Sequence, residues 1–105
     1  MNELDRLYAE LLRVGLVVLR QANDSGDHEW VRAEVDLLHN LPGLLDETNP
    51  ERHRHFWHEE RQQYIDWLSA HGSAEAASRM RTYYEPIWAQ LETLVEERFG
   101  LVARS

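Results

Sequence analysis

Two glutamates lie at positions where amphipathic helices should be apolar, and they are the strongest candidates for chemistry. Glu34 interrupts the apolar stripe that contains Trp30, and Glu60 interrupts the one that contains Tyr64. Two carboxylates close together in a core raise the pKa of one of them, which suits acid–base work. The sequence therefore predicts a polar layer inside the protein.

The turns between helices predict which residues share this layer. Residues at one level of two antiparallel helices have numbers with a constant sum, because both helices rise by the same distance per residue. We expect Glu34 to face positions 57 to 60 and Glu60 to face Tyr84. His53 lies on the same stripe as Glu60 and is within reach of either carboxylate as a hydrogen-bond partner.

Three interpretations of the two carboxylates remain open. In the first, arginine or tyrosine side chains neutralise them, since buried charges are normally paired; Arg81, on the edge of the inner face of its helix, is one such partner. In the second, the carboxylates line a small pocket or a metal site. In the third, one of them lies at a dimer interface. The candidate ligand-binding residues are Glu34, Glu60, Tyr84, His53 and Arg81.

Three closely spaced histidines suggest a metal site only in the linear sequence. On a helix, His53 points inward, His55 lies on the opposite side and His58 lies on a flank. A di-iron bundle needs Glu-x-x-His on two helices, whereas Leu37 and Gln63 stand three residues after the two glutamates. We therefore expect no metal and no cofactor.

Composition narrows the class of protein. The 105 residues carry a net charge of −8, which disfavours a nucleic-acid binder that relies on a positive surface. There is no cysteine, so thiolate catalysis and cysteine-ligated zinc are excluded. All 11 basic residues are arginine, a bias typical of a GC-rich bacterial genome. No apolar run is long enough to span a bilayer, and we expect a cytoplasmic protein.

The elements that carry these residues are four amphipathic helices. Asp27, Asn49 and Ser73 are suitable N-caps for the second, third and fourth helices, and Gly72 is placed to follow the C-terminus of the third. Pro86 lies inside the fourth helix and should kink it. The predicted helices cover residues 2–22, 27–41, 49–70 and 73–99. With short connections they imply an all-α, antiparallel four-helix bundle, a single domain over residues 1–105.

Excess apolar surface points to an interaction role. Leu16 and Val17 lie off the buried stripe of the first helix, and four tryptophans and four tyrosines are many for a small chain. We therefore predict a homodimer and a non-enzymatic interaction or regulatory module whose helix faces bind a protein. The alternative is a bundle that binds a small ligand or metal through its internal layer, with enzymatic activity left open.

Overall fold

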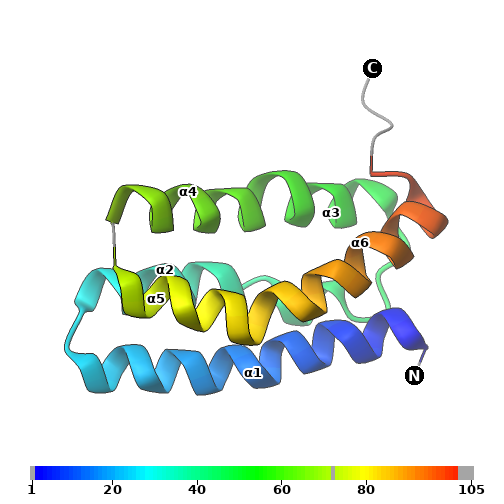
Figure 1. Cartoon of the computed structure of the whole chain (residues 1–105). Coiled ribbons are helices and arrows are strands. Elements are labelled where there is room, and N and C mark those ends of the chain that lie inside the picture. The colour runs from blue at the N-terminus through cyan, green and yellow to red at the C-terminus, as the bar shows by residue number, and fades with distance from the viewer. Residues whose placement is uncertain (1, 72, 102–105) are drawn as a thin grey trace.

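Four long helical segments pack antiparallel in the computed structural model, which describes residues 2–71 and 73–101 (Figure 1). The first two segments are α1 (Glu3–Ser25) and α2 (His28–Leu38), followed by a 3₁₀ turn, η1 (Leu41–Leu44). The third consists of α3 (Pro50–His55), η2 (Phe56–Glu60) and α4 (Arg61–His71), and the fourth of α5 (Ala74–Arg79), η3 (Met80–Tyr84) and α6 (Glu85–Phe99). The predicted all-α, antiparallel bundle is confirmed.

The predicted helix starts are confirmed by their caps. The side chain of Asp27 accepts a hydrogen bond from the Trp30 amide at 3.1 Å. Asn49 accepts one from the Glu51 amide at 3.0 Å, and Ser73 accepts one from the Ala76 amide at 3.2 Å. These side chains satisfy amides that have no partner inside their own helix. Gly72 lies outside the described residues.

Two π-helical turns, η2 and η3, interrupt the third and fourth segments. Each adds an extra residue to one turn, so the helix faces before and after it lose the regular 3.6-residue phase. The second turn ends two residues before Pro86, where Figure 1 shows α5 and α6 meeting at a bend. The predicted kink is therefore present, and a π-helical turn accompanies the proline there.

The second helix is shorter than predicted and ends at Leu38, not Leu41. The chain then passes through η1, which packs on α1, before α3 begins at Pro50. A methyl group added to Gly15 would meet the Leu38 side chain at 2.2 Å, so this glycine leaves room for Leu38 in the contact between α1 and α2. No described helix is long and apolar enough to cross a membrane.

Candidate functional site

The Glu34 carboxylate is fully buried and is held by three donors from three helical segments. The Tyr64 hydroxyl from α4 donates to Oε2, and the Tyr84 hydroxyl at the end of η3 donates to Oε1. The Trp30 indole, one turn before Glu34 on α2, donates to Oε2 at 3.1 Å. A network of this kind fixes the register of the helices that contribute to it. We call these four side chains the Glu34 cluster.

Burial raises the pKa of the Glu34 carboxyl to about 7, although hydrogen bonds from Tyr64, Tyr84 and Trp30 lower it. Burial, reinforced by the Glu34 charge, also raises the pKa of both tyrosine hydroxyls. Both phenols are therefore neutral donors, and the carboxyl is the member of the cluster that changes protonation near neutrality. Of the partner types predicted for Glu34, tyrosine supplies hydrogen bonds, which satisfy the carboxylate oxygens but carry no compensating charge.

The π-helical turn η2 explains why Tyr64, and not Glu60, faces Glu34. Phe56 and Tyr64 are separated by eight residues, which in a regular α-helix is a rotation of about 80°. Because the wider π turn rotates less per residue, both side chains reach the buried face. The predicted pairing of Glu34 with positions 57 to 60 is therefore displaced by about one turn.

The structure corrects the prediction that Glu60 shares a buried layer with Glu34. Glu60 is only partly buried and faces a groove between α2 and α4, where the Asn40 side-chain amide donates to its carboxylate. Tyr84 faces Tyr64, with ring centroids 5.7 Å apart, where Glu60 had been predicted to lie opposite it. The two carboxylates are thus separated: one is sealed in the core and one is open to the groove.

Arg81 is likewise not part of the cluster, because its side chain is exposed. It stands three residues before Tyr84, within the π-helical turn η3. A turn that rotates less per residue carries this position further from the buried face than a regular α-helix would. None of the hydrogen bonds to Glu34 among the described residues comes from an arginine.

His53 is buried as predicted, but in a second polar cluster near the other end of α1. Its Nε2 donates to the Glu47 carbonyl at 2.9 Å, so its Nδ1 accepts from the Tyr8 hydroxyl at 2.9 Å. Its ring stacks on Phe99 with centroids 4.4 Å apart. Burial lowers the pKa of His53 and so favours the neutral imidazole, although the hydrogen bond to the Glu47 carbonyl raises this pKa. We call His53, Tyr8 and the Glu47 carbonyl the His53 cluster.

Asp5, which the sequence did not mark as a site residue, is buried and holds the connection before α3. Its carboxylate accepts from the Asp46 amide at 2.9 Å, where Asp46 has a left-handed φ of 59°. Asp5 lies three residues before Tyr8 in the first turn of α1, a place where an acid is common and signals nothing unusual. The apolar spacing did place Tyr64 on the buried face, but the pairing of its hydroxyl with Glu34 depends on the π-helical turn.

Two other histidines, His58 and His71, join helix ends, and the predicted divergence of His53, His55 and His58 is confirmed. His55 is exposed, and His58 donates to the Leu101 carbonyl at 2.6 Å. His71 contacts Asp27 at 2.7 Å through Nε2 and Glu29 at 2.9 Å through Nδ1, so the end of α4 is tied to the start of α2. The hydrogen bond to Asp27 raises the pKa of His71.

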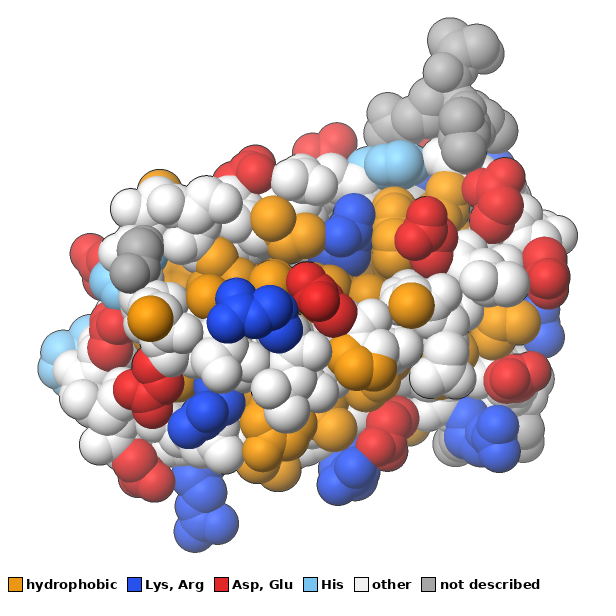
Figure 2. Space-filling view, in the orientation of Figure 1, with side chains coloured by type: hydrophobic (Ala, Val, Ile, Leu, Met, Phe, Trp, Pro, Cys, Tyr) orange, Lys and Arg blue, Asp and Glu red, His pale blue; other side chains and the backbone are white. Residues whose placement is uncertain are grey.

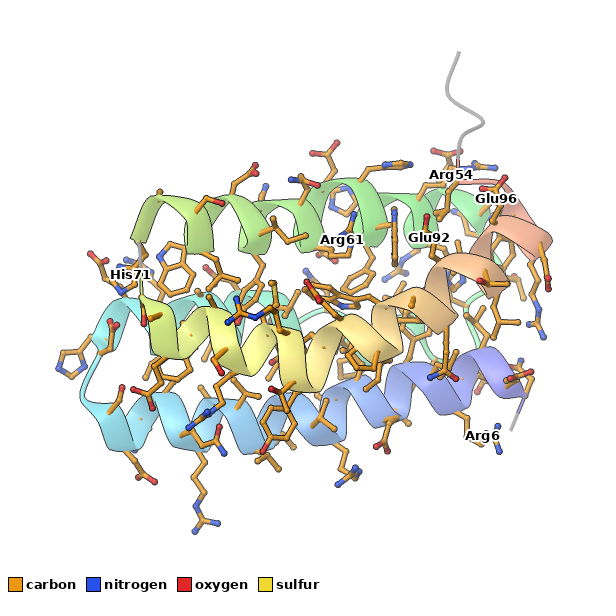
Figure 3. The ribbon with its side chains drawn as sticks, viewed as in Figure 1. Arg6, Arg54, Arg61, His71, Glu92 and Glu96 are labelled. Atoms are coloured by element: carbon orange, nitrogen blue, oxygen red, sulfur yellow. The ribbon has the colours of Figure 1, made fainter. Side chains whose placement is uncertain are left out.

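Arg61, at the start of α4, packs its guanidinium against two tryptophan rings, Trp57 of η2 and Trp88 of α6. Its guanidinium lies 4.0 Å from the Trp57 ring centre and 5.6 Å from that of Trp88, at a shallow cleft of about 260 Å³. Burial lowers the pKa of Arg61, while Glu92 on α6 raises it. Figure 3 shows Arg61 and Glu92 on the two neighbouring helices, and Figure 2 shows hydrophobic side chains gathered along the middle of this face.

Replacing Arg61 with methionine should therefore lower the free energy of unfolding by about 1 kcal/mol, because the apolar stem is kept while the cation–π contact is lost. Arg20→Met on the exposed face of α1 is the matched control and should change stability by less than about 0.5 kcal/mol. Urea unfolding followed by tryptophan fluorescence measures both. Equal effects of the two substitutions would show that the contact contributes nothing.

The groove between α2 and α4 is the larger open feature and has a volume of about 550 Å³. Its lining comprises Glu29, Arg32, Ala33, Asp36, Leu37, His39, Asn40, Glu60, Gln63, Tyr64 and Trp67. Tyr64 belongs both to this lining and to the Glu34 cluster, so the groove and the buried cluster share one side chain. We call this feature the α2/α4 groove.

Comparison with protein-family models, with curated proteins and with solved structures gives no match.

Proposed function

We propose that this protein is a non-enzymatic interaction module of the bacterial cytoplasm that acts as a homodimer and binds a protein partner through its helix faces. The observation that carries this proposal is the exposure of large apolar side chains on α1 and α2. Leu16 is 55% exposed, Val35 45% and Val17 39%. Such residues on neighbouring helices form the kind of surface that protein interfaces cover.

The state of the buried polar groups also supports an interaction role over catalysis. Both oxygens of Glu34 accept hydrogen bonds inside the core, and both ring nitrogens of His53 have partners. Both side chains are fully buried. A catalytic acid or base must come within hydrogen-bond distance of its substrate, directly or through one water. These two clusters serve the packing of the bundle instead.

Two exposed apolar residues define the proposed dimer surface. Leu16 follows Gly15, which faces Leu38 on α2, and Val35 precedes Leu38 by three residues. Helical spacing puts Leu16 on one stripe with Leu12 and Leu19, and Val35 on one stripe with Val31 and Leu38. The neighbouring members of both stripes are packed against the core. We call the outer edge of this contact the α1/α2 ridge.

A double variant of the α1/α2 ridge tests the proposal. Size-exclusion chromatography with light scattering should find a dimer for the parent protein and a monomer for Leu16→Glu/Val35→Glu, because burying two carboxylates opposes association. The control Gln62→Glu/Gln90→Glu adds the same charge at exposed positions and should remain dimeric. A monomeric parent protein at tens of micromolar would contradict the predicted dimer. A ridge variant that remains dimeric would show that the interface lies on another surface.

Small-ligand binding is the second candidate function, and the α2/α4 groove is the observation that favours it. Ligand sites have volumes of roughly 300–1,000 Å³ and combine apolar walls with a few polar groups. The groove has a comparable volume of about 550 Å³ and contains Glu60, one of the predicted site residues. Glu34, His53 and Arg81 are not among its lining residues.

A further inference from the structure

The α2/α4 groove has an apolar floor and a rim that is richer in acids than in bases. The floor contains Leu37, Tyr64 and the partly buried indole of Trp67. The acidic members of the lining are Glu29, Asp36 and Glu60, and the basic ones are Arg32 and His39. Among the described residues, no basic group lies within ion-pair distance of Asp36 or Glu60.

Several of these groups are held in place before any partner binds. Glu60 accepts a hydrogen bond from Asn40, and Glu29 contacts His71 at 2.9 Å. Tyr64 is fixed by its bond to Glu34, and the Trp67 ring stacks on that of His71 with centroids 4.6 Å apart. Side chains that are already ordered lose less conformational entropy on binding.

We propose that the α2/α4 groove binds a basic, amphipathic segment of a partner protein. An arginine or lysine head group pairs with Asp36 and Glu60, while the aliphatic and apolar side chains of the segment pack on Tyr64 and Trp67. The inference deepens the proposed function by giving the chemistry of the partner, and it rests on that function. Charge complementarity favours this occupant: the protein carries a net charge of −8, and a polyanion would meet carboxylates at the rim.

A labelled synthetic peptide with four Arg-Ala-Leu repeats is the probe, and fluorescence anisotropy at physiological salt measures its binding. Asp36→Asn/Glu60→Gln should weaken binding by about tenfold, because two partners of the basic head groups are lost. Glu3→Gln/Glu97→Gln changes the net charge equally at exposed positions outside the groove and should weaken binding by less than about twofold. Equal weakening by the two variants would overturn the proposal in favour of general charge attraction.

Two further measurements separate the other outcomes. Spermidine, a free amine, should compete with the peptide only weakly, and competition at concentrations near those of the peptide would assign the groove to a small cation instead. Light scattering on Asp36→Asn/Glu60→Gln should give the oligomeric state of the parent protein, since neither residue lies on the α1/α2 ridge. Loss of peptide binding with an unchanged dimer supports the groove. Peptide binding by a monomeric parent protein contradicts only the dimer, whereas a parent protein that does not bind the peptide overturns the groove assignment alone.

Discussion

Replacing Glu34 with glutamine should remove a pH dependence worth about 3 kcal/mol from the stability of this protein. Burial raises the pKa of the Glu34 carboxyl from 4.5 to about 7, so the folded state favours the protonated form. Each pKa unit corresponds to about 1.4 kcal/mol. The contribution of Glu34 to stability is fully present below pH 4.5, falls as the pH rises to 7, and is constant above that.

The measurement is the difference in unfolding free energy between Glu34→Gln and the parent protein at several pH values. Relative to the parent, the variant should gain about 3 kcal/mol between pH 4 and pH 8. Other groups cancel in this difference, including His53, whose lowered pKa has the opposite effect on stability as the pH falls. Glu60→Gln, in the open groove, is the matched control for the change from carboxylate to amide. A flat difference for Glu34→Gln would mean that its three donors keep the carboxylate ionised.

The Glu34 cluster also illustrates why a buried carboxylate persists in a small core. Replacing such a network by well-packed apolar side chains is often neutral or stabilising, so stability alone does not explain it. Here the carboxylate links α2 to α4 and to the junction of η3 with α6, where the two tyrosines arrive from different segments. We propose that the cluster selects one register among these helices, since a shift by one turn would leave the carboxylate unpaired.

The sequence was sufficient to predict the fold class because local signals repeat along the chain. Capping side chains mark the starts of the helices, and apolar spacing marks their buried faces; both depend on residues a few positions apart. The burial of Glu34 and His53 followed from this periodicity. The same information predicts an antiparallel arrangement, since the connections between the helices are short.

The residues of the polar layer could not be predicted, because they depend on where the helices depart from the regular 3.6-residue period. Two π-helical turns and an early end of α2 change the phase and the level of the facing helices. As a result, Tyr64 takes the place predicted for Glu60, and His53 bonds to Tyr8 at another level of the bundle. No residue type marks a π-helical turn as Pro marks a kink or Gly a C-cap.

Replacing His53 with phenylalanine should lower the free energy of unfolding by about 3 kcal/mol, the largest effect we expect from a single ring substitution here. The aromatic volume is roughly kept, but the Tyr8 hydroxyl and the Glu47 carbonyl lose their partner. A polar group left unpaired in a core costs about 1–3 kcal/mol. His55→Phe, at an exposed position of the same helix, is the control and should change stability by less than about 0.5 kcal/mol.

A double-mutant cycle with Tyr8→Phe separates the hydrogen bond from the packing of the ring. Tyr8→Phe alone leaves Nδ1 of His53 unpaired, whereas the double variant removes the Tyr8 hydroxyl and Nδ1 together. The double variant should therefore be more stable than the sum of the single effects predicts, by about 1 kcal/mol. Denaturant unfolding is measured at pH 8, where the imidazole is neutral in both the folded and the unfolded state, so that protonation does not add to the coupling between Tyr8 and His53. Strict additivity would show that the Tyr8 hydroxyl and the imidazole do not stabilise each other. The stability lost in His53→Phe would then come only from the stacking on Phe99 and the hydrogen bond to the Glu47 carbonyl.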